Sequence, residues 1–166
     1  MRTIGIDPGS RFTGYGIIDG DGQRLCHVAN GIVRMSGDIP FPERLRMIYE
    51  HLSRVIDETR PECMAIEEVF FAKNVQSALK LGQARGAAIL AGVNAGLPVY
   101  EYSALQIKQS VVGYGKAGKE QVGEMIQYLF RLGGAINQNA SDALAVAVCH
   151  LNTHSSRVRW NLPGRL

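Results

Sequence analysis

The sequence predicts an α/β protein in which helices flank a mixed five-stranded sheet, with three antiparallel strands followed by two parallel strands. Three observations support this prediction. The first third of the chain alternates apolar and polar residues around an Asp-Gly-Asp-Gly turn at 19–22. Apolar residues then recur at spacings of three and four, as they do in amphipathic helices. Two short apolar runs separated by a helical stretch follow, and such crossovers give parallel strands.

The first three strands form the antiparallel part of the sheet. Arg2–Asp7 alternates isoleucines with small or polar residues and ends on an acid, just before a Pro-Gly-Ser turn. Phe12–Asp19 is the second strand. The turn at 19–22 requires positive φ and leads into the third strand, Gln23–Met35. This part of the chain is therefore expected to be a meander.

A helix and a buried strand come next. Apolar residues recur with helical spacing over Pro42–Arg60, which has a proline at its start and Pro61 just beyond its end. The run Cys63–Ile66 is too short for a helix and closely follows a proline, so we expect a buried strand there. That strand leads into Glu67 and Glu68, which places a second acid at a strand end.

The rest of the chain alternates helices with one more strand. An asparagine can cap a helix from Val75 to about Asn94, and this helix is rich in glycine and alanine, which favours close packing. Leu97–Tyr102 is the fifth strand. Three further helices are expected, over Ser103 to about Val112, Lys119–Leu132, and Ser141 to about Thr153.

Length and composition indicate one soluble domain. The 166 residues suit a folded domain over 1–153 and a basic, flexible tail over 154–166. Apolar residues are 46% and charged residues 20%, which excludes disorder. We find neither a run of membrane-spanning length nor a signal-peptide pattern, so a cytoplasmic protein is expected. Three widely spaced cysteines are expected to be reduced core thiols: Cys26, Cys63 and Cys149.

The charge is unevenly distributed along the chain. The net charge is only +3, but between Val69 and Lys119 six basic residues stand against one acid, Glu101. The stretch 40–68 before it is acidic. Two interpretations are open at this point: a surface for a polyanionic partner, or an ordinary solvated helix face.

Acidic residues at element ends predict a metal site. If the first and fourth strands are parallel neighbours, about 4.8 Å apart, Asp7 and Glu67 emerge at one edge of the sheet. Ligands bind at that edge in α/β sheets. Asp142 lies near the start of the last helix, and Asn139 shares its face if the helix begins early enough. Such oxygen ligands suit Mg²⁺ or Mn²⁺.

Each of these residues also has a purely structural interpretation. Asp7 before Pro-Gly-Ser suits an Asx turn, Glu68 suits a surface position, and Asp142 suits a helix first turn. The segment 6–14 also resembles the phosphate-binding hairpin of the sugar kinase, actin and chaperone ATPase superfamily. That fold needs two large lobes, which 166 residues cannot supply.

Four stretches of the chain carry a more specific pattern: GIDPGSRFTGYG at 5–16, AIEEVFFAKNVQSALKLGQARGAA at 65–88, VYEYSALQIKQSVVGYGKAGKEQV at 99–122 and SDALAVAVCH at 141–150. Together they resemble the RuvC family of bacterial Holliday junction resolvases, and the second stretch is the most specific. The resemblance implies a ribonuclease H-like nuclease domain that forms a homodimer through the helix over 75–94. It also implies cleavage of two strands of like polarity at a four-way DNA junction, in DNA recombination and repair. Two Mg²⁺ ions per active site, with Mn²⁺ as a substitute, and cooperation with the RuvA-RuvB branch-migration complex are implied as well.

The resemblance places the family's metal-binding catalytic acids on Asp7, Glu67 and Asp142. The fourth position falls on Asn139, where the family usually has Asp or, in some members, His. An amide keeps one coordinating oxygen but removes a negative charge, which should weaken the second ion most. Either the natural enzyme uses Asn139, or the residue is a substitution that silences cleavage while leaving junction binding intact; we favour the second interpretation.

The resemblance also suggests residues that contact DNA. Phe70 matches a family aromatic that helps to open base pairs at the junction centre, and stacking on a base is worth about 1–3 kcal/mol. Lys108 and Lys119 match family lysines assigned to DNA. Lys73, Lys80, Arg85 and Lys116 lie in the same basic stretch and are further candidates.

Two alternative functions stay open on sequence grounds. One is a module that binds junctions without cleaving them, because Asn139 lacks the usual charge. The other is a ribonuclease H-type nuclease for RNA-DNA hybrids, which would share the fold and the acids.

Overall fold

The computed structural model describes residues 1–21, 24–68, 74–134 and 136–159, with side chains through residue 155 in the last helix. Its strands are β1 (Arg2–Asp7), β2 (Phe12–Gly20), β3 (Leu25–Arg34), β4 (Cys63–Glu67) and β5 (Val99–Tyr102). Its helices are α1 (Phe41–Thr59), α2 (Val75–Asn94), α3 (Ala104–Val112), α4 (Lys119–Phe130) and α5 (Gln138–Arg159).

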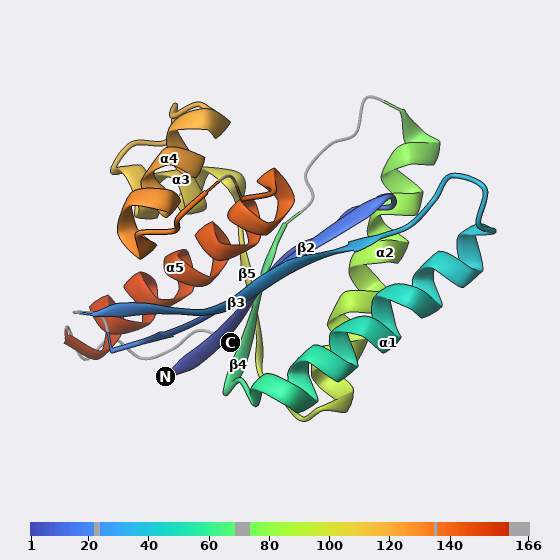
Figure 1. The fold of residues 1–166 in the computed structure, drawn as a ribbon, viewed down its shortest axis with the longest axis horizontal. Helices are drawn as coiled ribbons and strands as arrows, with labels where there is room; N and C mark the ends of the chain where they lie inside the picture. Colours follow the sequence, from blue (N-terminus) through green and yellow to red (C-terminus); the bar gives the residue numbers. More distant parts are fainter. Residues whose placement is uncertain (22–23, 69–73, 135, 160–166) are drawn as a thin grey trace.

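The five strands form one mixed sheet in the order β3-β2-β1-β4-β5. The strands β1, β2 and β3 pair antiparallel, and β4 runs parallel to both β1 and β5. Figure 1 shows α1 and α2 covering one face of this sheet and α3, α4 and α5 covering the other. The mixed five-stranded sheet predicted from the sequence is therefore confirmed.

Each face of the sheet carries its own apolar core. Alternate residues of a strand point to opposite faces, so Ile4 and Ile6 of β1 pack toward α1 and α2. Ala65 of β4 and Ile18 of β2 pack instead with α5. Both cores exclude water almost completely at these positions, which fixes the strand register.

Glycines in β1 and β2 allow α5 to lie directly on the sheet. A β-carbon added at Gly5 would overlap the Ala143 carbonyl oxygen and come within 2.7 Å of the Ala147 nitrogen, both in the α5 backbone. Gly16, the register partner of Gly5, meets Leu144 of the same helix. The close approach is possible only because these strand positions lack side chains.

The helix α5 is longer than the sequence predicted. It begins at Gln138 instead of Ser141 because the Asn137 side chain accepts a hydrogen bond from the Asn139 backbone nitrogen at 3.0 Å. This is the pattern of an N-cap. It continues to Arg159, six residues past the expected end and into the segment predicted as a flexible tail. Asn139 and Asp142 therefore both lie in α5, as they must in order to share a face of that helix.

Smaller differences concern strand ends and one cysteine. The strand β5 begins at Val99 and not at Leu97, and β4 includes Glu67 as its last residue. The expectation of three core thiols is wrong for Cys26, which is exposed because it lies on the outward side of β3. Cys63 and Cys149 are buried and free, as predicted. Among the described residues, none of the helices has the length and apolar content needed to cross a membrane.

We predict that Gly5→Ala will strongly destabilise the protein. The added methyl group would strike the backbone of α5, which cannot move without disturbing the whole face, so the cost should be about 3 kcal/mol or more. Thermal unfolding should show a loss of about 6 °C or more in Tm. Gly37→Ala is the matched control, since its β-carbon would meet only the Arg11 side chain, at 3.8 Å. Equal Tm values for the two variants would contradict this account of the packing.

Candidate active site

The two strand-end acids lie side by side at one edge of the sheet. In the parallel pairing of β1 with β4, Ile6 is the register partner of Ile66, and the next residues along the two strands are Asp7 and Glu67. Both acids are partly buried, and the carboxyl ends of both strands face the same edge. The arrangement expected from the sequence is therefore present.

A third acid reaches this edge from α5. Asp142 lies in the second turn of that helix, and its side chain is only 15% exposed. Its carboxylate accepts a hydrogen bond from the Nζ atom of Lys119 at 3.2 Å. Because Lys119 is the first residue of α4, this ion pair ties the start of α4 to the start of α5.

The acids influence one another's protonation. Burial, followed by the charges of Glu67 and Asp142, raises the pKa of Asp7 to about 7, while Lys119 opposes this rise. Burial also raises the pKa of Glu67, against the opposing charges of Lys119 and Lys108. Burial alone would lower the pKa of Lys119, but the acids outweigh burial and raise it. Asp7, Glu67, Asp142 and Lys119 thus form one electrostatic cluster, which we call the acidic cluster.

Arg85 of α2 holds the end of β4 from the other face of the sheet. Its Nε atom donates a hydrogen bond to the Glu67 carbonyl oxygen at 3.2 Å, and its guanidinium also pairs with Glu101 of β5. The Glu68 nitrogen donates to the Tyr102 carbonyl oxygen at 2.8 Å. These bonds fix the backbone where Glu67 leaves the sheet.

Asn139 precedes Asp142 by one helical turn and lies on the same face of α5. Its Nδ2 atom donates to the Asn137 side-chain oxygen at 3.4 Å. The backbone of Asn139 packs against Gly14, where a β-carbon would overlap its carbonyl group. Since Gly14 is the register partner of Asp7, the glycine brings the start of α5 next to that acid.

A groove of about 890 Å³ opens beside the acidic cluster. It runs between α4 and the start of α5, and its lining includes Lys119, Ser141 and Asp142. The Ser141 hydroxyl is buried without a hydrogen-bond partner among the described residues. The groove therefore gives a ligand access to the Asp142 side of the cluster.

The structure brings together some of the residues predicted from the sequence and separates others. The charge of Lys108 in α3 opposes the rise in the pKa of Glu67. Lys116 is exposed in the turn between α3 and α4. Phe70 and Lys73 lie outside the described residues. The sequence did not indicate the role of Arg85 at β4, because its partners are 16 and 18 residues away in the chain. Only the pairing of the strands with α2 reveals it.

The donor set fits a hard divalent cation. One ammonium group pairs with Asp142 and interacts with the charges of Asp7 and Glu67, and carboxylate oxygens of this kind suit Mg²⁺. In the described part of the chain, no three His, Cys, Asp or Glu side chains are grouped closely enough to hold a metal ion without movement. The fit therefore rests on charge and ligand chemistry.

Comparison with known proteins identifies the family. Residues 3–150 match the family described as crossover junction endodeoxyribonuclease RuvC. A protein of that name from Geobacter sulfurreducens is 63% identical over 153 residues, which cover 92% of this chain and 93% of the relative. The counterpart from Geobacter metallireducens is 61% identical over the same length and coverage. The chain belongs to the RuvC family. It is thus a member of a family of endonucleases.

Solved RuvC structures share the whole fold. Thermus thermophilus RuvC, solved in complex with a Holliday junction substrate, superposes with a TM-score of 0.88 at 34% identity. The match covers 94% of this chain and 96% of that RuvC chain. The yeast mitochondrial Holliday junction resolvase matches at 11% identity with a TM-score of 0.63, which shows the fold alone. The ribonuclease H-like fold implied by the resemblance to RuvC is therefore confirmed.

We predict that Asp7→Asn will stabilise the metal-free RuvC chain at high pH. The pKa of Asp7 is about 7 in the folded protein against an ordinary value of 3.8. Between these values the folded state holds a proton that the unfolded chain has released, so stability falls as pH rises through this window. The variant should gain about 4 kcal/mol at pH 8, or about 8–16 °C in Tm, and the gain should shrink toward pH 4.

Thermal unfolding in EDTA across this pH range measures the effect. Asp57→Asn is the matched control, because Asp57 is exposed on α1 and its replacement should leave Tm almost unchanged at every pH. Added Mg²⁺ should raise the Tm of the natural chain and not that of Asp7→Asn. If Asp7→Asn raises Tm equally at pH 4 and pH 8, ionisation of Asp7 does not destabilise the folded protein.

Proposed function

We propose that this protein is a Holliday junction resolvase, which cuts two strands of like polarity at a four-way DNA junction by phosphodiester hydrolysis. One observation supports this proposal above the others. The acidic cluster stands at the joined ends of β1 and β4, in a chain that shares its fold and 34% identity with a RuvC solved on a Holliday junction. Such a substrate places the activity in DNA recombination and repair.

We assign metal binding to Asp7, Glu67 and Asp142, with the amide oxygen of Asn139 as a fourth ligand. The charges of the three acids act on Lys119, and three carboxylates need more positive charge than one ammonium supplies, which supports this assignment. When bound, a pair of Mg²⁺ ions, or Mn²⁺ in their place, activates water and stabilises the leaving oxygen of a phosphodiester.

The chain's own residues prepare the site for this chemistry. The Lys119 ammonium opposes the rise in the pKa of both Asp7 and Glu67, which favours the ionised carboxylates. The hydrogen bond from Arg85 fixes the backbone of Glu67, which limits the positions that the Glu67 carboxylate can take. Partial burial keeps water away from Asp7 and strengthens every charge interaction there.

We propose that basic residues on the α3–α4 side hold the DNA backbone. Lys108 lies close enough to influence Glu67, and Lys116 is exposed in the next turn. Contacts from these lysines to phosphates would be independent of base sequence. The roles of Phe70 in opening base pairs and of Lys73 in DNA binding are proposed from the family resemblance alone.

We propose that two copies of the chain pair through α2. The outer face of this helix exposes Val75, Leu79, Leu90 and Val93, at spacings that place them on one side. Gly82 and Gly86 lie between them, and β-carbons added there would meet no atom within 4 Å. An exposed apolar face with small residues at its centre suits close, self-complementary packing in a C2 dimer.

The remaining parts of the proposal concern the cellular setting and the chain's extent. We propose cooperation with the RuvA-RuvB branch-migration complex in the cytoplasm, where a bacterial DNA junction would be found. Residues 1–153 are proposed as the nuclease domain, with 154–166 as a basic extension.

A second candidate function, junction binding without cleavage, is favoured by the neutral side chain of Asn139.

Variants of the acidic cluster separate these functions. We expect Asp7→Asn and Asp142→Asn to bind a four-way junction while cleavage falls by about 100-fold or more, because each removes charge that holds Mg²⁺. Asn139→Asp adds a carboxylate at the same volume and should raise the cleavage rate. Binding is measured in EDTA, and cleavage in single turnover with Mg²⁺.

The products identify which proposal holds. Paired, symmetric nicks in strands of like polarity support the resolvase. Binding without nicks, both in the natural chain and in Asn139→Asp, would establish the binding module instead. An RNA-DNA hybrid that displaced the junction at equal concentration would argue for a ribonuclease H-type nuclease.

A second prediction concerns the dimer. Leu79 is 63% exposed and Leu90 51% exposed, so replacing both by Glu should leave the folded monomer intact and split the dimer by charge repulsion. Sedimentation should show halved mass, and junction nicks should become uncoordinated. Tyr128→Glu on α4, where the side chain is 79% exposed, is the control and should remain dimeric. A natural chain that sediments as a monomer at all concentrations would refute the proposed interface.

A further inference from the structure

A basic surface lies beside the acidic cluster on the side away from the α3–α4 lysines. Arg11 ends the turn after β1, and Arg34 is the last residue of β3; both are exposed. Phe12, 38% exposed, begins β2 and is the register partner of Arg34. The Arg34 guanidinium lies 5.5 Å from the centre of the Phe12 ring. We call these three residues the arginine surface.

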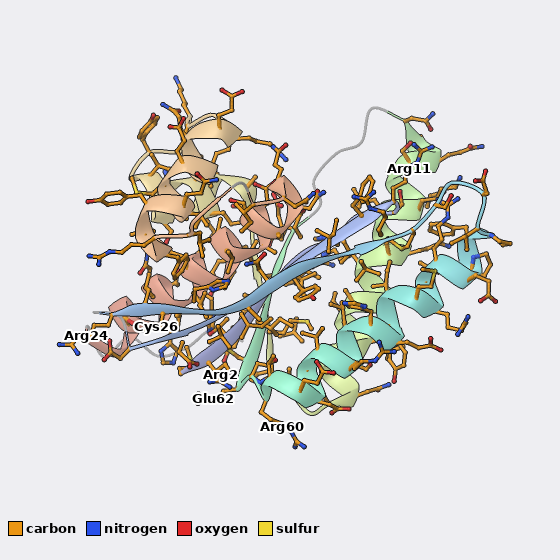
Figure 2. The ribbon with its side chains drawn as sticks, viewed as in Figure 1. Arg2, Arg11, Arg24, Cys26, Arg60 and Glu62 are labelled. Atoms are coloured by element: carbon orange, nitrogen blue, oxygen red, sulfur yellow. The ribbon has the colours of Figure 1, made fainter. Side chains whose placement is uncertain are left out.

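The arginine surface lies at the same end of the sheet as the acidic cluster. The strand order β3-β2-β1-β4 places Arg34, Phe12, Asp7 and Glu67 at the same end of four neighbouring strands, with Phe12 and Arg34 two residues beyond the level of Asp7. Figure 2 shows Arg11 at the opposite end of the sheet from Arg2. Two strand spacings separate β3 from β1, about 10 Å, which is about three base-pair steps along a DNA helix.

The charges of the arginine surface have no acidic partner in the part of the chain that the structure describes. Neither Arg11 nor Arg34 forms an ion pair with any residue that the structure describes. The two acids nearest to Arg34 in sequence have other contacts: Asp38 accepts from the Ser36 hydroxyl at 3.1 Å, and Glu43 pairs with Arg46 at 2.9 Å. Asp7, the acid nearest to Arg11 in sequence, belongs to the acidic cluster. Both guanidinium groups are therefore available to an external anion.

The backbone beneath the arginine surface is held by specific bonds. The Met35 nitrogen donates to the Arg11 carbonyl oxygen at 2.9 Å, and the Thr13 hydroxyl donates to the Gly9 carbonyl oxygen at 2.9 Å. Arg44 of α1 donates to the Ile39 carbonyl oxygen at 2.8 Å and reaches the Ser10 carbonyl oxygen at 3.5 Å. Arginines on a fixed backbone lose less entropy when they bind a ligand.

We propose that Arg11 and Arg34 bind phosphates of the DNA strand that crosses the acidic cluster, so that DNA is held on both sides of the scissile bond. Lys108 of α3 and Lys116 of the following turn hold one side, and the arginine surface holds the other. Guanidinium groups bind phosphate oxygens through paired hydrogen bonds, and the Phe12 ring orients that of Arg34. This inference rests on the proposed DNA substrate and adds a second contact surface to it.

The test compares variants with equal charge changes at the two ends of the sheet. Arg11→Ala/Arg34→Ala removes the arginine surface. Arg24→Ala/Arg54→Ala removes two exposed arginines elsewhere, and Figure 2 shows Arg24 far from Arg11. Affinity for a four-way junction and for a linear duplex is measured in EDTA across a salt series. Lys108→Ala serves as a reference for a lysine on the α3–α4 side.

The arginine surface variant should show a clear change in salt dependence. Each lost phosphate contact should reduce the slope of log affinity against log salt by about 0.9, or about 1.8 for the pair. Affinity near 0.1 M salt should fall about five- to tenfold per arginine. Arg34→Lys keeps the charge and should retain its share of the slope, which separates charge from any effect of folding.

The outcomes distinguish this inference from the proposed function. If the natural chain binds and cuts junctions but the arginine and control pairs have equal slopes, the arginine surface is only solvated and the inference fails. If the chain binds DNA without cutting junctions and the arginine pair still loses its slope, the inference stands while the resolvase proposal fails. A chain that binds no DNA overturns both.

Discussion

The contact between α5 and the glycines of β1 and β2 determines where every functional group lies. Gly5 and Gly14 let the helix backbone rest on the strand backbones, so the start of α5 comes to the end of β1. Larger side chains at those positions would lift the helix and carry Asp142 away from Asp7. The site thus requires glycine at these two positions of the sheet. The buried alanines of α5 continue the same close packing along the helix.

This packing has an electrostatic consequence. By burying strand and helix ends together, it brings three carboxylates into one partly dehydrated region, which raises the pKa of Asp7 to about 7. A fold optimised for stability alone would avoid such an arrangement, because an isolated chain gains nothing from repelling charges. The apolar cores on the two faces supply enough stability to tolerate it. A cluster of this kind is typical of a site that binds a cation.

The sequence predicted much of this arrangement and missed the parts that depend on distant contacts. Strand-end acids were predictable because Asp7 and Glu67 each follow a short apolar run, and parallel strands bring such ends together. The early start of α5 was missed because its cap, Asn137, lies in a polar stretch without an apolar period. The exposure of Cys26 depends on which face of β3 turns inward, and a strand with glycine and asparagine among its residues signals this weakly.

Arg85 connects the proposed dimer helix, α2, to the acidic cluster. The residue lies on α2, whose outer face we propose as the dimer contact, and it holds the backbone of Glu67 on β4. A force that shifts α2 against the sheet must therefore strain the bond from Arg85 or move Glu67 with it. Because a C2 interface through α2 repeats this connection in both copies, pairing would constrain both sites equally. The same helix that joins two protomers would thus help to hold their acids in equivalent positions, which a junction with two equivalent strands requires.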